Sequence, residues 1–166
     1  MQACVNRFTS QSLATRVALA LALFAAGALH AMPGANAQQS KPARLIIFWV
    51  QDGAYDCLEC HPEVRVKADG NNHPVIGQSY DTISVKVMDA KSIRITTRKD
   101  GKIVAEQTRT VTDDGKTLTV QNVSHPAGTD RVVRTETLCT RDASGPAGSH
   151  ATSGSWRIVG LRIVSQ

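Results

Sequence analysis

Hydrophobic and polar residues alternate along much of the chain after residue 44. In Thr82–Met88, the apolar residues Ile83, Val85 and Val87 alternate with Ser84 and Lys86. Ser92–Lys99 follows the same pattern. A period of two with β-branched residues is typical of strands that bury one face. We therefore predict two neighbouring strands here.

Tight turns separate these runs and join them to the next. Asp100-Gly101 follows the second run, and Asp-Gly between two alternating runs indicates a β-hairpin. The strand pattern resumes over Lys102–Thr112. After a further turn at Asp113–Lys116 it returns over Thr117–Val123. Four consecutive strands with short links predict an antiparallel meander.

Four further strand-like runs flank this meander: Arg44–Val50, Val64–Ala68, Arg131–Leu138 and Trp156–Val164. Together with the meander they give about eight predicted strands, and no helix is predicted after residue 37. A sheet with one apolar face must curl or stack to bury it, so we predict an all-β fold, an up-and-down barrel or partial barrel. One set of apolar residues is predicted either to line a ligand cavity or to fill a core: Ile83, Val85, Val87, Ile93, Ile95, Ile103, Leu118 and Val120.

The first 37 residues have the layout of a secretory signal peptide. The segment contains no Asp or Glu, its apolar run is Val17–Leu29, and Ala35-Asn36-Ala37 supplies small residues for cleavage before Gln38. We predict a signal-peptide helix over 1–37 and a periplasmic or secreted mature protein. No apolar run reaches the roughly 18 residues of a membrane span, so none is expected after cleavage.

Charge and composition argue against a nucleic-acid-binding function. The 166 residues carry a formal net charge of +5, which falls when Arg7 and Arg16 leave with the signal peptide. Aromatic residues make up only 4% of the chain, and the basic residues alternate along strands. A nucleic-acid interface needs a basic face with stacking aromatics, so we expect no nucleic-acid partner.

The remaining segments set the expected organisation. Residues 38–63 hold a strand and a cysteine-containing loop, 64–142 hold the meander, and 156–166 form a C-terminal strand. The Gly/Ser-rich segment Ala143–Ser155 has no periodicity and predicts a linker or long loop. Removing Ala143–Gln166 is therefore expected to cost the domain little.

Several of the hairpin motifs resemble those of secreted bacterial lipocalin-like proteins. They include Ala68-Asp69-Gly70, His73-Pro74-Val75, Asp100-Gly101-Lys102 and Asp114–Val120. The resemblance implies a barrel that holds a small apolar ligand in its mouth. Gly154-Ser155-Trp156 resembles the G-x-W element that opens the first lipocalin strand, although here it lies near the C-terminus. It implies either a truncated second unit or the last strand of one sheet.

The cysteines form the one motif with distinct chemistry. Cys57-Leu58-Glu59-Cys60-His61 has the C-x-x-C-H spacing of c-type haem attachment, in which two thiols bond the haem and the histidine ligates iron. In an exported protein the alternative is a disulfide among Cys57, Cys60 and Cys139. A redox site remains open, as does a zinc site that adds His73 to Cys57, Cys60 and His61.

The sequence contains no G-x-S-x-G, P-loop or H-E-x-x-H motif, so we expect no catalytic residues, no metal and no enzyme activity. The leading hypothesis is a secreted lipocalin-like protein that binds a small apolar ligand without a cofactor. The alternatives are a haem c electron carrier, with Met88 or a second histidine as the distal ligand, and a purely structural envelope protein. The sequence leaves the oligomeric state open.

Overall fold

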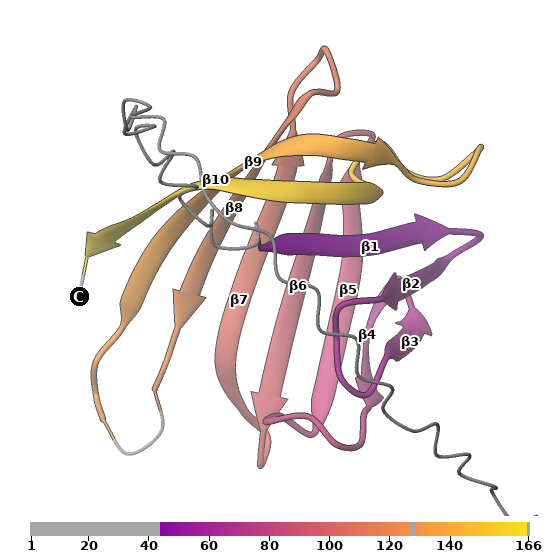
Figure 1. Cartoon of the computed structure of the whole chain (residues 1–166). Coiled ribbons are helices and arrows are strands. Elements are labelled where there is room, and N and C mark those ends of the chain that lie inside the picture. Colours follow the sequence, from indigo (N-terminus) through magenta and orange to yellow (C-terminus); the bar gives the residue numbers. More distant parts are fainter. Residues whose placement is uncertain (1–43, 127–128, 166) are drawn as a thin grey trace, which may run out of the picture. The chain divides into compact units, whose positions relative to one another are not determined.

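The structure is a computed structural model that describes residues 44–126 and 129–165. The predicted signal-peptide helix lies outside the described residues. The described part is all-β, with ten antiparallel strands in one nearly closed barrel (Figure 1). The strands are β1 Leu45–Gln51, β2 Ala54–Cys57, β3 Val64–Lys67, β4 Asp69–Pro74, β5 Thr82–Asp89, β6 Ser92–Lys99, β7 Lys102–Val111, β8 Thr117–Ser124, β9 Val133–Ser144 and β10 Gly154–Ser165.

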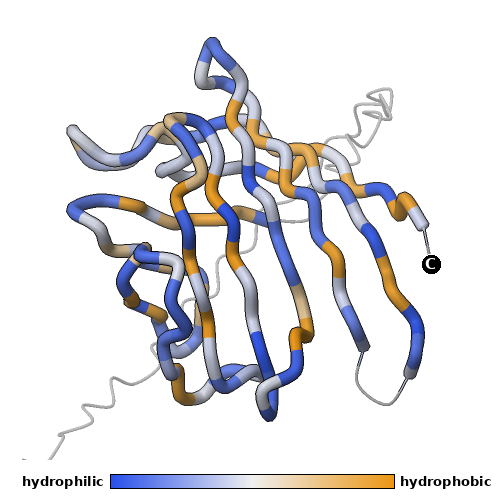
Figure 2. The backbone as a smooth tube through the Cα atoms, turned by 180° about the vertical axis from the view of Figure 1, so that it is seen from behind, coloured by the Kyte–Doolittle hydropathy of each residue, from blue (hydrophilic) through white to orange (hydrophobic). Residues whose placement is uncertain are grey.

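The predicted meander is confirmed as β5 to β9, where each strand pairs with the next along the chain. Hydrophobic and hydrophilic positions alternate along these strands (Figure 2). The predicted hairpin turn is also confirmed, because Asp100 and Gly101 both have positive φ, at 49° and 75°. Two left-handed residues between paired strands match the right-handed twist of the hairpin.

The barrel closes in two ways. On one side β10 lies between β9 and β1, and pairs with both. On the other side β3 and β4 are separated only by Ala68. They behave as one bent strand whose first half pairs with β2 and whose second half pairs with β5. The two ends of the hydrogen-bonded sheet are therefore joined by the chain itself.

The C-terminal strand is an integral part of this barrel. Trp156 is fully buried, and its indole Nε1 donates a hydrogen bond to the Thr152 carbonyl oxygen at 2.9 Å. The segment predicted as a linker contains the end of β9 and the start of β10, and Thr152 and Ser153 within it are buried. The segment is therefore no mere linker: strands occupy both its ends, and the loop between them contributes buried residues.

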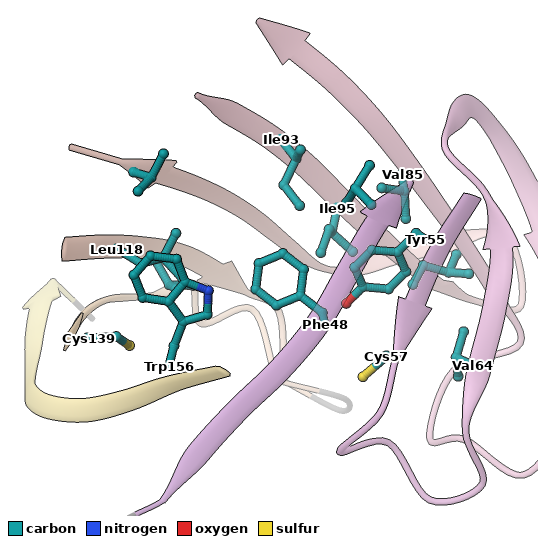
Figure 3. Packing of buried hydrophobic residues seen from close by; sticks show 14 residues of the cluster. Phe48, Tyr55, Cys57, Val64, Val85, Ile93, Ile95, Leu118, Cys139 and Trp156 are labelled. Atoms are coloured by element: carbon teal, nitrogen blue, oxygen red, sulfur yellow. The ribbon is translucent and has the colours of Figure 1, made fainter. Parts of the chain in front are cut away.

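The interior is filled at the end where Trp156 lies. Phe48 from β1, Tyr55 from β2 and Trp156 from β10 point across the barrel toward apolar residues of the meander, among them Val85, Ile93, Ile95 and Leu118 (Figure 3). The guanidinium carbon of Arg141 lies 4.0 Å from the centre of the Trp156 ring, so Arg141 covers the interior at this end. Within the described residues, no helix is long and apolar enough to cross a membrane.

Candidate functional site

The opposite end of the barrel contains a cavity of about 480 Å³. Tyr55, Ile83 and Ile95 form its inner, apolar wall, and they lie on inward-facing positions of β2, β5 and β6. Residues from the connections form its outer part, namely Glu59, Cys60, Ser79, Tyr80 and His125. A cavity of this size, enclosed by strands and bordered by loops, is typical of a small-molecule site.

A buried arginine forms the polar floor of this cavity. Arg109 lies on the inward face of β7, where its cross-strand neighbours are Ile93 and Val120. Its side chain is only 7% exposed. The guanidinium carbon lies 4.3 Å from the centre of the Phe48 ring, and Nη2 donates a hydrogen bond to Gln107 Oε1 at 3.1 Å. Packing of a cation on an aromatic face is favourable and holds the side chain in position.

Two of the Arg109 nitrogen atoms lack a partner. Nε and Nη1 are buried and make no hydrogen bond in the structure. A buried polar group without a hydrogen bond is costly, and a charged one more so. Arg109 therefore presents two unsatisfied donors inside the barrel.

Two tyrosines share this environment. Burial raises the pKa of Tyr55, while the nearby Arg109 charge and a hydrogen bond with Arg109 oppose that shift. Burial also raises the pKa of Tyr80. Both phenols therefore stay protonated at neutral pH and can donate hydrogen bonds.

A second cavity, of about 340 Å³, adjoins the first. The two share Glu59, Gln107 and Arg109, so the guanidinium lies at their junction. Asn122 lines the second cavity, and its Oδ1 is another buried atom without a hydrogen-bond partner. A further unsatisfied polar atom therefore lines the second cavity, which Arg109 also borders.

Six of the eight predicted lining or core residues are buried: Ile83, Val85, Ile93, Ile95, Leu118 and Val120. Only Ile83 and Ile95 line the first cavity, and Val120 lines the second. Val87 lies near the end of β5 and is 40% exposed. Ile103 is 38% exposed because a bulge shifts the register between β6 and β7, so that Ile103 pairs with the outward-facing Arg98.

The cysteine motif lies at the border of the first cavity. Cys57 ends β2, Cys60 follows in the next connection, and their sulfur atoms form a disulfide. Attachment of haem c requires both thiols, so the disulfide and the haem are mutually exclusive. The His61 ring bonds the Glu59 carbonyl oxygen through Nδ1. Among the described residues, no group of three or more His, Cys, Asp or Glu side chains is arranged to hold a metal ion.

Cys139 is the third cysteine of the described part, and it is a fully buried free thiol. Burial raises its pKa, which lowers the fraction of reactive thiolate. We expect Ellman's reagent to leave a chain that begins at Gln38 unmodified while it is folded. In guanidinium chloride without reductant, one thiol per chain should react. The Cys139→Ser variant, as the control, should give none. Rapid reaction of the folded chain, or three reactive thiols, would contradict this assignment.

Sequence reasoning missed Arg109, Gln107 and Tyr55. The signal for Arg109 was its position two residues before Val111 on the same strand, which places both on one face. The fold and the site define a class: an antiparallel β-barrel with an internal cavity and a buried cation. Comparisons with models of protein families, with curated proteins and with solved structures found no match to this chain.

Proposed function

We propose that this protein binds a small molecule with a largely apolar body inside its barrel. The observation that carries the proposal is the cavity of about 480 Å³, whose inner wall is apolar while its floor supplies hydrogen-bond donors. Ligand sites usually combine an apolar lining with a few placed polar groups that orient the ligand. The lipocalin-like hairpin motifs support the same role.

The proposal includes export and a binding role without catalysis. The layout of residues 1–37 favours export, and the Cys57–Cys60 disulfide suits the oxidising compartment to which export leads. The groups around the cavity floor include a guanidinium, an amide, a carboxylate and two phenols, which can bind and orient a ligand by hydrogen bonding. We propose a periplasmic or secreted carrier or sensor of a small molecule.

Titration with N-phenyl-1-naphthylamine, a neutral probe that fluoresces in apolar surroundings, tests this function. We expect a saturable rise in fluorescence. Ala105→Trp should weaken binding at least tenfold, because Ala105 lines the cavity and a larger side chain would fill it. Thr110→Trp is the matched control, since Thr110 is exposed on the same strand. It should bind as the unmodified protein does.

Two outcomes would contradict the proposal. One is the absence of saturable fluorescence with the folded protein, which would favour a structural role. The other is equal binding by the Ala105→Trp and Thr110→Trp variants, which would place the probe on the outer surface. Circular dichroism of each variant establishes that the barrel is intact before the titrations are compared.

A further inference from the structure

The buried Arg109 carries a positive charge that the described part of the chain leaves without a paired anion. None of the ion pairs in the described part of the chain includes Arg109. The groups against its side chain are the Gln107 amide oxygen, the Phe48 ring and the Tyr55 phenol, and all three are uncharged. Charges removed from water are normally paired, so an isolated buried guanidinium indicates a missing partner.

Glu59 is the acidic residue of the cavity lining that could serve as the paired anion of Arg109. It lines both cavities with Arg109, but no ion pair joins the two side chains. Glu59 Oε2 instead accepts a hydrogen bond from the Ile47 backbone nitrogen at 2.8 Å, which holds it toward β1. The Glu59 carboxylate is therefore held toward β1, forms no ion pair with the guanidinium, and leaves the Arg109 donors unsatisfied.

The unpartnered donors suit an acidic group in particular. Nε and Nη1 lie on different edges of the planar guanidinium, and each can donate a separate hydrogen bond. A hydrogen bond from a guanidinium to a carboxylate oxygen is charge-assisted and therefore stronger than one to a neutral acceptor. Lys99 at the border of the cavity adds a second positive charge, and His125 lies in the same lining. With Arg109 and Lys99 against the single carboxylate of Glu59, the charge of the lining favours a negative ligand over a neutral or positive one.

We propose that Arg109 anchors the carboxylate of an apolar monocarboxylic acid, with the ligand's apolar body along Ile83, Ile95 and Tyr55. This inference rests on the proposed function, because it names the class of ligand for the same cavity. The ligand supplies the anion that the barrel lacks, and the apolar wall accommodates the rest of the molecule. Burial of the head group beside Phe48 strengthens the charge pairing, since water no longer screens it.

Three ligands whose main chain has ten carbon atoms test the head group: decanoate, 1-decanol and decyltrimethylammonium. Each competes with N-phenyl-1-naphthylamine for the purified protein at pH 8, below its micelle concentration. We expect decanoate to bind at least tenfold more tightly than 1-decanol, and the cation to bind most weakly. Because these comparisons use the unmodified protein, they decide the question even where a variant fails to fold.

The variant Arg109→Met keeps an unbranched apolar stem and removes the guanidinium and its charge. It should weaken decanoate at least tenfold, to the level of 1-decanol, and change 1-decanol by less than threefold. Arg94→Met is the matched control, because Arg94 is exposed on the neighbouring strand β6. It lowers the net charge equally, so it separates a specific anchor from general electrostatic attraction. Its preference for decanoate should equal that of the unmodified protein.

The outcomes separate this inference from the function on which it rests. Equal binding of decanoate and 1-decanol would overturn the anchor and leave the cavity's binding role intact. A preference for decanoate that survives in Arg109→Met would also overturn the anchor. Failure of the neutral probe to bind the folded protein would overturn the binding role and the anchor together.

Discussion

Replacing Trp156 with alanine is expected to lower the free energy of unfolding by about 3–5 kcal/mol. Trp156 is the largest of the fully buried side chains, so the change opens a large cavity at the filled end of the barrel. It also removes the hydrogen bond from Nε1 to Thr152 and the aromatic face on which Arg141 packs. Urea denaturation followed by circular dichroism measures the loss, because that signal does not depend on tryptophan.

The control is Leu161→Ala in the same strand. Leu161 is 67% exposed, so its loss should change the free energy of unfolding by less than about 0.5 kcal/mol. If Trp156→Ala were as mild as Leu161→Ala, β10 would be dispensable. The expectation from sequence, that residues 143–166 form an appendage, would then be right after all.

Arg141→Met is expected to cost about 2–3 kcal/mol, because Arg141 ties three segments together at the filled end. Its guanidinium donates hydrogen bonds to the carbonyl oxygens of Gly115, Ala151 and Ser153, and packs on the Trp156 ring. Arg141→Lys should recover only part of the loss, since an ammonium lacks the planar fork that reaches several carbonyls. Chemical denaturation of both variants measures the difference.

Arg157→Met is the matched control for the loss of a positive charge. Arg157 is half-exposed and pairs with Asp142 on the surface, where an ion pair contributes about 1 kcal/mol or less. Equal destabilisation by Arg141→Met and Arg157→Met would show that charge, and not the contacts of the guanidinium, accounts for the effect.

Alternating or continuous apolar runs predicted eight of the ten strands, and the short turns predicted the antiparallel order of β5 to β8. Strand β2 was missed although Asp52-Gly53 before it is the same dipeptide as Asp100-Gly101, and both residues have positive φ. Strand β4 was missed because Asp69-Gly70-Asn71-Asn72 has the composition of a turn. The structure accommodates it as an irregular strand with a register shift between Asp69 and Asn72.

The sequence left the role of Trp156 undecided, because the strand that contains it resembles an opening strand but lies near the C-terminus. In a closed meander the first and last strands are neighbours, so the same place in the barrel can be filled from either end of the chain. Here β10 fills it, beside both β9 and β1. Linear order alone could not distinguish this arrangement from a truncated second unit.

The candidate site was harder to predict than the fold. Alternation indicates which residues share a face of a strand. It does not reveal that a charged residue such as Arg109 lies on the buried face. The bulge between β6 and β7 also reverses the facing of residues before it, which turned Ile103 outward. The location of the cavity depends on where large side chains such as Phe48 and Trp156 fill the barrel, and that emerges only in three dimensions.

The place of β10 between β9 and β1 determines when the barrel can form. The Val50 backbone nitrogen bonds Ser153 Oγ at 2.9 Å across 103 residues of sequence. A contact between such distant residues requires closure of a long loop, which slows folding. During synthesis, β1 has no partner on this side until the tenth strand has been made, and an unpaired strand edge promotes aggregation.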